Sequence, residues 1–189
     1  LDAREGRIEP AIERARKLAG AVSPGRQRTI EGEIYLLAGR TKDALSAYEA
    51  AHRAEPSTGT ALRVFSLRRA TAIAAPERVL EEWLARAPND AVVRRQLASY
   101  YQSTGQADRA IAHYEALLSR DQADPPSLNN LAWLLHGKGD SRALDLARRA
   151  YEAAPHVPEI GDTYGWILVR MGKVSEGLAV LQSALVNAT

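Results

Sequence analysis

The chain has 189 residues, 46% of them hydrophobic, with a formal net charge of +2 and no cysteine. The absence of cysteine excludes a disulfide framework and a cysteine-based zinc site, and it is compatible with either the cytosol or the periplasm. No stretch approaches the ~20 consecutive apolar residues of a membrane-spanning helix. A composition rich in alanine and leucine, with scarcely a run of β-branched residues, favours stacked helices.

Glycines recur along the chain with a fixed period. Gly105, Gly139 and Gly172 are 34 and 33 residues apart, and Gly39 precedes Gly105 by 66 residues, which is two periods. A small residue follows each of these glycines after four or five positions. Self-similarity at this period is typical of a solenoid built from helical hairpins. The small residues that follow are Ala44, Ala110, Ala143 and Gly177.

Read in chain order, the period divides the sequence into helix pairs. Residues 1–23 begin inside a unit, with Gly6 in the glycine position. The unit 57–88 is degenerate because it lacks the central glycine, so the register of residues 57–76 stays open. The chain starts inside a unit and ends without a polar capping helix, so we expect a fragment of a longer array. The units are 1–23 (partial), 24–56, 57–88, 89–123, 124–156 and 157–189.

Glycines and capping residues have local roles in this pattern. Gly39 and its equivalents can adopt the left-handed conformation that ends a first helix. Ser23 and Asp124, each followed by proline, are predicted N-caps of first helices, and Thr41 and Ser141 are predicted caps of second helices. Seven residues before each glycine, a small residue lets the two helices of a pair approach closely. These small residues are Gly32, Ala98, Ala132 and Gly165.

The full pattern resembles the tetratricopeptide repeat. In the unit 124–156, the small Ala132 and the apolar Leu135 precede Gly139, and Pro155 closes the unit. The resemblance spans essentially the whole chain and implies an all-α, right-handed α-solenoid of about five and a half repeats. It also implies a non-enzymatic scaffold that holds a protein or peptide partner in a concave groove lined by the first helices. The tryptophan that the consensus places first in each unit is replaced by Arg28, Arg94, Leu128 and Gly161.

The chain carries no residue pattern typical of an active site. Its four histidines occur in no H-E-x-x-H or other close ligand spacing, and no phosphate-binding glycine loop is present. We therefore expect no catalytic residue, no metal and no cofactor, a surface or packing role for His52 and His113, and a core position for Trp83. Arginine pairs such as Arg68-Arg69 lie among acidic residues rather than with stacking aromatics, so no nucleic-acid partner is expected.

Helical geometry singles out two tryptophans as candidate ligand contacts. At about 100° per residue, the apolar residues of the segment 128–135 cluster on one side of their helix, and Trp133 points about 150° away. Trp166 has the same place in the next unit, so the pair forms a candidate aromatic ladder in the groove. The alternative is structural: each indole wedges between neighbouring first helices and donates its N–H to Asn129 or Asp162. The candidate groove residues are Arg95, Ser99, Asn129, Trp133, His136, Asp162, Trp166 and Arg170.

The last two units are similar to the final repeats of bacterial tetratricopeptide-repeat lipoproteins of PEP-CTERM sorting and exopolysaccharide gene clusters (PrsT-like). The similarity rests on residues 129–135 and 162–170. It implies a parent protein in the periplasm or at the outer membrane that assists polymer or protein export; without it, a cytoplasmic location is expected. Two other functions stay open: carbohydrate binding through Trp133 and Trp166, and a regulatory repeat region of a larger enzyme such as a glycosyltransferase.

The final helix carries an apolar stripe that a further helix would ordinarily cover. Exposed apolar surface of this kind promotes association. We therefore expect end-mediated self-association of the chain. The stripe consists of Val180, Leu181, Ala184 and Leu185.

Overall fold

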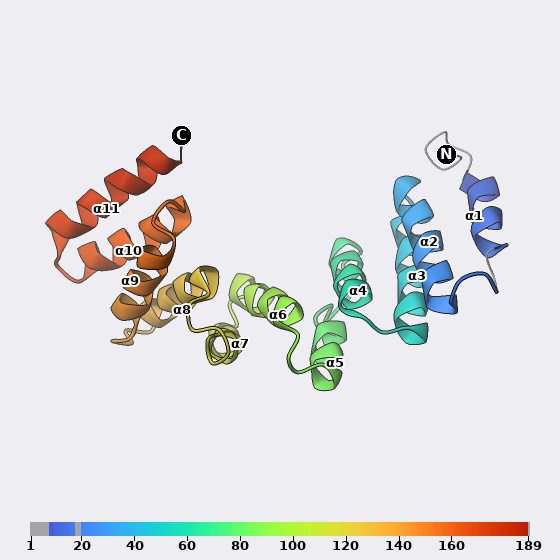
Figure 1. Cartoon of the computed structure of the whole chain (residues 1–189), viewed down its shortest axis with the longest axis horizontal. Helices are drawn as coiled ribbons and strands as arrows, with labels where there is room; N and C mark the ends of the chain where they lie inside the picture. The colour runs from blue at the N-terminus through green and yellow to red at the C-terminus, as the bar shows by residue number, and fades with distance from the viewer. Residues whose placement is uncertain (1–7, 18–19, 189) are drawn as a thin grey trace. The chain divides into compact units, whose positions relative to one another are not determined.

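The computed structural model describes residues 8–17 and 20–188, and the regular elements of this part are eleven α-helices (Figure 1). Gly6 lies outside the described residues. After the first helix, the helices follow one another as antiparallel pairs. Their bounds are α1 (Ile8–Arg16), α2 (Pro24–Leu37), α3 (Thr41–Ala54), α4 (Thr58–Ala70), α5 (Arg78–Arg86), α6 (Ala91–Ser103), α7 (Ala107–Leu118), α8 (Pro125–Gly137), α9 (Ala143–Ala153), α10 (Pro158–Arg170) and α11 (Val174–Asn187).

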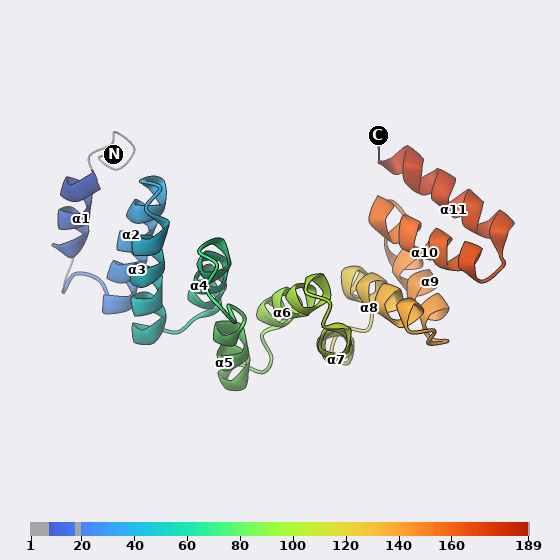
Figure 2. The same cartoon turned by 180° about the vertical axis from the view of Figure 1, so that it is seen from behind.

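The chain divides into two compact units, residues 1–93 (unit 1) and 94–189 (unit 2). In unit 1, α2 packs against α3, and α3 packs against α4. In unit 2, α8 pairs with α9 and α10 with α11, while α9 also packs against α10. The α2–α3 and α10–α11 pairs are seen side by side from both directions (Figure 2). The predicted all-α fold of sequential helix pairs, a tetratricopeptide-like solenoid, is therefore confirmed.

Small residues set the distance between the helices of a pair, as the sequence predicts. A Cβ added to Gly32 would lie 2.6 Å from the ring of Tyr48, so only glycine lets α2 and α3 approach this closely. In the last pair the contact is between backbones: a Cβ on Gly177 would lie 2.7 Å from the carbonyl oxygen of Gly165. The equivalent alanines of the α6–α7 and α8–α9 pairs, Ala98 and Ala132, are fully buried.

Left-handed residues end the first helices. Gly39, Gly105, Gly139 and Gly172 have φ values of 71°, 74°, 71° and 83°, which confirms their predicted role. In the degenerate unit, Ala72 takes the same conformation, with φ 54°. Ala72 lies 33 residues after Gly39 and 33 before Gly105, so it occupies the missing glycine position. The register that the sequence left open is therefore fixed, with α4 ending at Ala70.

Helix caps follow the sequence for first helices but not for second helices. Ser23 Oγ accepts from the backbone N–H of Arg26 at 3.3 Å, and Asp124 Oδ2 accepts from that of Ser127 at 3.3 Å. The predicted caps Thr41 and Ser141 are wrong. Thr41 is already the first residue of α3, whose N-cap position has no side-chain hydrogen bond, and Ser141 precedes the N-cap of α9. The N-cap positions of these two helices, Arg40 and Arg142, do not have the extended backbone of a capping residue, and neither side chain forms a capping hydrogen bond.

A polar cluster joins α3, α4 and α5 in unit 1. Asp90 Oδ2 accepts hydrogen bonds from the hydroxyl of Thr58 and from Trp83 Nε1, the latter at 2.7 Å. The ring of His52 meets the indole of Trp83 edge-on, with 6.1 Å between centroids, and His52 Nδ1 lies 2.8 Å from Thr60 Oγ1. Trp83 is half-buried, so its predicted place in the core is corrected: its ring packs, but its N–H needs a carboxylate partner.

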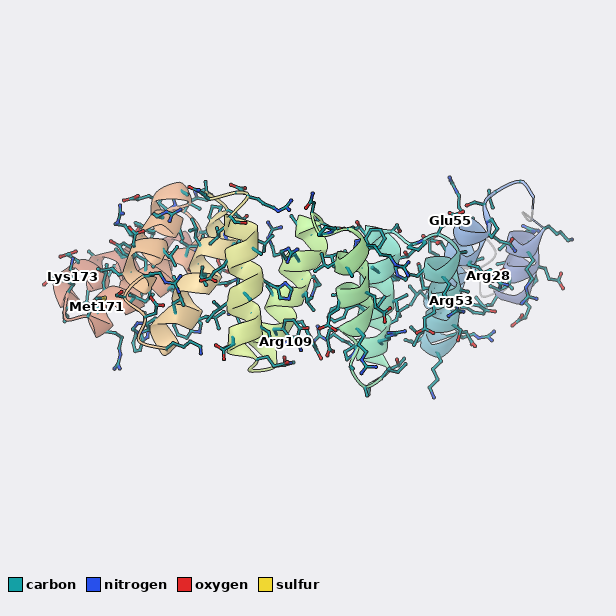
Figure 3. The ribbon with its side chains drawn as sticks, turned by 90° about the horizontal axis from the view of Figure 1, so that it is seen from below. Arg28, Arg53, Glu55, Arg109, Met171 and Lys173 are labelled. Atoms are coloured by element: carbon teal, nitrogen blue, oxygen red, sulfur yellow. The ribbon has the colours of Figure 1, made fainter. Side chains whose placement is uncertain are left out.

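The apolar stripe of α11 differs from the one predicted. Ala184 is 2% exposed because it faces Gly161, where an added Cβ would lie 2.8 Å away. Val180 and Leu181 are half-buried, whereas Leu185 is 70% exposed. Met171 and Lys173 mark the turn that leads into α11 (Figure 3). The exposed large apolar residues of this helix are Val174, Leu178, Leu185 and Val186.

Candidate functional site

The helical pattern of α8 and α10 places the two tryptophans on an exposed face. Leu128, Leu131, Ala132 and Leu135 of α8 are at most 3% exposed, whereas Trp133 on the other side is 47% exposed. Trp166 of α10 is 45% exposed, although Ile167 and Leu168 beside it are buried. Because α8 and α10 pack against each other in unit 2, the two indoles belong to one surface.

The structural alternative for the tryptophans makes a specific prediction about their N–H groups. Within residues 8–17 and 20–188, neither indole N–H donates a hydrogen bond, to Asn129, to Asp162 or to any other group. About half of each side chain is in contact with protein and the other half is open to solvent. Trp133 and Trp166 are therefore partly packed and partly exposed, as aromatic residues at binding surfaces often are.

Polar residues flank each tryptophan at helical spacing. On α10, Asp162 and Arg170 lie four residues before and after Trp166, and both are exposed. Residues at this spacing are neighbours on one helix face. On α8, Asn129 and His136 flank Trp133 and are half-buried. We call this surface the tryptophan face: Asn129, Trp133, His136, Asp162, Trp166 and Arg170.

Arg95 and Ser99 come from α6 and extend the predicted set by one helix. Arg95 Nη2 donates to Asp124 Oδ1 at 3.2 Å, which ties α6 to the N-terminal cap of α8. Ser99 is exposed. The structure thus places all eight predicted residues on the first helices of unit 2, with the six of the tryptophan face on the packed pair α8 and α10.

Two buried polar atoms of the predicted residues have no partner. Arg95 Nε, a donor, and Asn129 Oδ1, an acceptor, are both shielded from solvent and make no hydrogen bond in the described part of the chain. An unsatisfied buried polar atom costs about 1–3 kcal/mol.

A hydrogen-bond chain behind α8 was not foreseen from the sequence. Tyr114 of α7 donates its hydroxyl to Gln102 Oε1 of α6 at 3.0 Å and accepts from Asn130 Nδ2 of α8 at 3.1 Å. Burial raises the pKa of Tyr114, although the bond from Asn130 opposes this rise. In the sequence, Tyr114 is the bulky residue nine positions after Gly105. That position predicts that its side chain is packed, but it does not predict the partners of its hydroxyl. These hydrogen bonds link α8 to α6 and α7 through Asn130, Tyr114 and Gln102.

Two cavities lie elsewhere, and neither is lined by a residue of the tryptophan face. One, of about 510 Å³, lies between α7, α8 and α9. The other, of about 170 Å³, lies between α1, α2 and α3. The described residues contain no group of three or more histidine, aspartate or glutamate side chains placed to hold a metal ion. The tryptophan face therefore lies outside both of these cavities.

The comparisons with known proteins agree with this fold. Residues 96–124 match the family model of the tetratricopeptide repeat. Comparison with curated protein sequences gives no match.

In the described part of the chain, no helix has the length and apolar character needed to span a membrane.

Several solved structures of MamA share the fold at low sequence identity. The MamA RS-1 ArsTM double mutant is similar with a TM-score of 0.75 and 14% identity, covering 87% of this chain and 94% of that one. The MamA 41-end structure from Desulfovibrio magneticus RS-1 gives 0.74 and 14%, covering 87% and 95%. MamA AMB-1 gives 0.66 and 21%, covering 85% and 89%. At these identities the likeness shows the fold, a tetratricopeptide-type stack of helix pairs.

Proposed function

We propose that this chain is a non-enzymatic scaffold that binds an extended segment of a protein partner on the tryptophan face of unit 2. The observation that carries the proposal is the pair of half-exposed indoles at equivalent positions of two packed first helices. Tryptophan is enriched among the few residues that supply most of the free energy of a protein interface. Its two torsion angles also cost little entropy when a partner immobilises it.

The polar groups around the indoles favour a polypeptide ligand. Asp162 and Arg170 present opposite charges on either side of Trp166, which suits a segment that carries both signs. A peptide that lies across α8 and α10 would contact both indoles and both of these charges.

The test is a selection of peptides on the intact chain. A random dodecapeptide phage library is selected on the wild-type protein, and the enriched peptides are measured against Trp133→Ala and Trp166→Ala. Each variant should weaken binding by about tenfold or more, the cost of a tryptophan hot spot. Leu37→Ala is the matched control, because Leu37 is 61% exposed on α2 of unit 1 and should leave binding unchanged. Peptides that bind both tryptophan variants as well as the wild type would refute the proposal.

Carbohydrate binding is the second candidate, because paired exposed aromatic rings can stack against sugars. An oligosaccharide array probed with the wild type and with both tryptophan variants distinguishes the two functions. Binding to oligosaccharides that depends on Trp133 and Trp166, without selection of any peptide, would replace the peptide proposal. A regulatory role beside a catalytic domain is compatible with either ligand.

The cellular setting is a further proposal, which rests on the resemblance drawn above from residues 129–135 and 162–170 alone. In this proposal the protein lies in the periplasm or at the outer membrane, in a pathway that exports polymer or protein. Fractionation of cells that produce the tagged native protein tests this location. Recovery in the cytoplasmic fraction would refute it.

Self-association through the exposed residues of α11 is likewise a proposal, for which sedimentation at increasing concentration is the measurement.

A further inference from the structure

Unit 1 contains a buried carboxylate at the floor of a cavity between α1, α2 and α3. Glu31 of α2 is 2% exposed, and it is the only charged residue in the buried set of the described chain. Arg28 Nη1 donates to Glu31 Oε2 at 2.7 Å, and Gln27 Nε2 donates to Oε1 at 3.3 Å. Arg28 is marked on α2 in Figure 3. The cavity of about 170 Å³ between α1, α2 and α3 opens onto Glu31.

The fold does not require an acid at this position. Glu31 precedes the small residue Gly32 of its helix pair, and Leu131 precedes the equivalent Ala132 in unit 2. Leu131 is 3% exposed and lines the cavity between α7, α8 and α9. This cavity corresponds to the one in unit 1, because each lies over a first helix and between two second helices. Burying a carboxylate costs free energy that a leucine would not cost. Glu31 therefore needs an explanation other than packing.

The cavity also contains a cation without a partner. Arg16 of α1 lines it, and among the described residues it makes no ion pair or hydrogen bond. Asp43, on the opposite wall, is already paired with Arg40 Nε at 2.7 Å. The bond from Gln27 to Glu31 Oε1 is long, so that oxygen can accept a shorter one. The groups open to a ligand are thus the positive guanidinium group of Arg16 and the negative carboxylate oxygen Oε1 of Glu31.

We propose that this cavity binds a small zwitterion, a free α-amino acid with a short side chain. Its ammonium group pairs with Glu31 Oε1, and its carboxylate is held by the guanidinium group of Arg16. The volume is below the 300–1,000 Å³ typical of sites for drug-sized ligands, which limits the ligand to a few heavy atoms. The short side chains of Ala47 and Ala50 form the wall that the ligand's side chain would face.

Isothermal titration calorimetry of the whole chain with L-alanine, glycine and L-serine tests the site. We expect a dissociation constant in about the millimolar range for at least one of them. N-acetyl-L-alanine lacks the cation and L-alaninamide lacks the carboxylate, so each should bind at least about tenfold more weakly than L-alanine. No heat of binding from all three amino acids would overturn the proposal. Equal binding of N-acetyl-L-alanine would also overturn it, because a simple carboxylate site would explain that result.

Variants separate a loss of the site from a loss of the fold. Glu31→Leu introduces the residue type that unit 2 uses at the equivalent position, so it should fold and lose amino-acid binding. Glu31→Gln keeps the shape of the side chain and should weaken binding about tenfold, as should Arg16→Ala. Arg53→Ala, an exposed arginine of α3 that does not line the cavity, is the charge-matched control and should bind normally (Figure 3). Unchanged affinity in the folded Glu31→Gln or Glu31→Leu protein would refute the site.

Discussion

Ala72 holds, at φ 54°, the left-handed conformation that Gly39 holds at φ 71° one repeat earlier. An alanine in this region brings its Cβ close to the following carbonyl oxygen, which costs roughly 1–2 kcal/mol. A second alanine of the same turn, Ala75, has φ 49°. The turn between α4 and α5 therefore has a left-handed residue at the repeat position of the glycines, without the residue that best suits it, and packing of the neighbouring helices must offset the strain.

Replacing Ala72 by glycine should stabilise unit 1. The relief of strain exceeds the extra entropy of glycine in the unfolded chain, so we expect a gain of about 0.5–1 kcal/mol. Urea denaturation and hydrogen exchange of α4 and α5 are the measurements. Ala85→Gly, at an exposed helical position of α5, is the control and should cost up to about 1 kcal/mol. A loss of stability in Ala72→Gly would show that the turn is not strained.

The same turn shows what the sequence can predict. The period of the glycines and the core pattern of residues 128–135 are local signals, so the helix pairs and the exposure of Trp133 could be predicted from them. The degenerate unit could not be placed because its left-handed residue is an alanine, whose conformation is imposed by the helices on either side. Thr41 fits the composition of a cap, yet the preceding turn determines that it is already helical.

The site was predictable only where one helix determines it. The spacing of Asp162, Trp166 and Arg170 on α10 follows from the helical period. The unpartnered atoms of Arg95 and Asn129, by contrast, depend on what the surrounding helices bury. The same is true of Glu31, which the repeat pattern gives no reason to single out, because its burial results from the packing of α2 in unit 1.

Gly165 should not tolerate alanine. An added Cβ would lie 2.7 Å from Leu181 Cγ and 2.9 Å from the carbonyl oxygen of Gly177, and that backbone atom cannot move away without separating α10 from α11. Overpacking of this kind costs roughly 1–3 kcal/mol. The measurement is thermal unfolding followed by circular dichroism. Gly137→Ala is the matched control: no atom lies within 4 Å of its Cβ, so it should be neutral or stabilising by up to about 1 kcal/mol. A Gly165→Ala protein as stable as the wild type would contradict the close backbone contact.

Trp133 and Trp166 should contribute little to stability. Removal of a fully buried aromatic side chain costs about 3–5 kcal/mol. Because each of these indoles is about half exposed and its N–H is unbonded, Trp133→Ala and Trp166→Ala should each cost less than about 2 kcal/mol. Tyr101→Ala, at a fully buried position of α6, supplies the reference for a core aromatic. Tryptophan variants that lose as much stability as Tyr101→Ala would make the two indoles structural wedges and remove them from the proposed site.

The His52 cluster should make unit 1 sensitive to mild acid. Burial lowers the pKa of His52 below its usual value of 6.5, and the charge of Arg86 lowers it further, although Glu82 opposes this and Arg68 adds to it. The folded chain therefore binds a proton at His52 less readily than the unfolded chain. The contribution to stability is complete above pH 6.5, and it is lost as the pH falls from 6.5 through the lower folded-state pKa.

We expect the urea midpoint of unit 1 to decrease between pH 7.5 and pH 5.5, as read from the fluorescence of Trp83 in a Trp133→Phe, Trp166→Phe background. His52→Asn should remove most of this pH dependence, because its amide can still bond to Thr60 but does not titrate. His156→Gln is the control, since His156 is exposed in the loop before α10 and packs in no such cluster. The carboxylate of Asp90 should not titrate between pH 7.5 and pH 5.5. Burial raises its pKa, but hydrogen bonds from Thr58 and Trp83 lower it more, so that its pKa lies below the usual 3.8. A midpoint that changes equally in the wild type and in His52→Asn would show that His52 is not the titrating group.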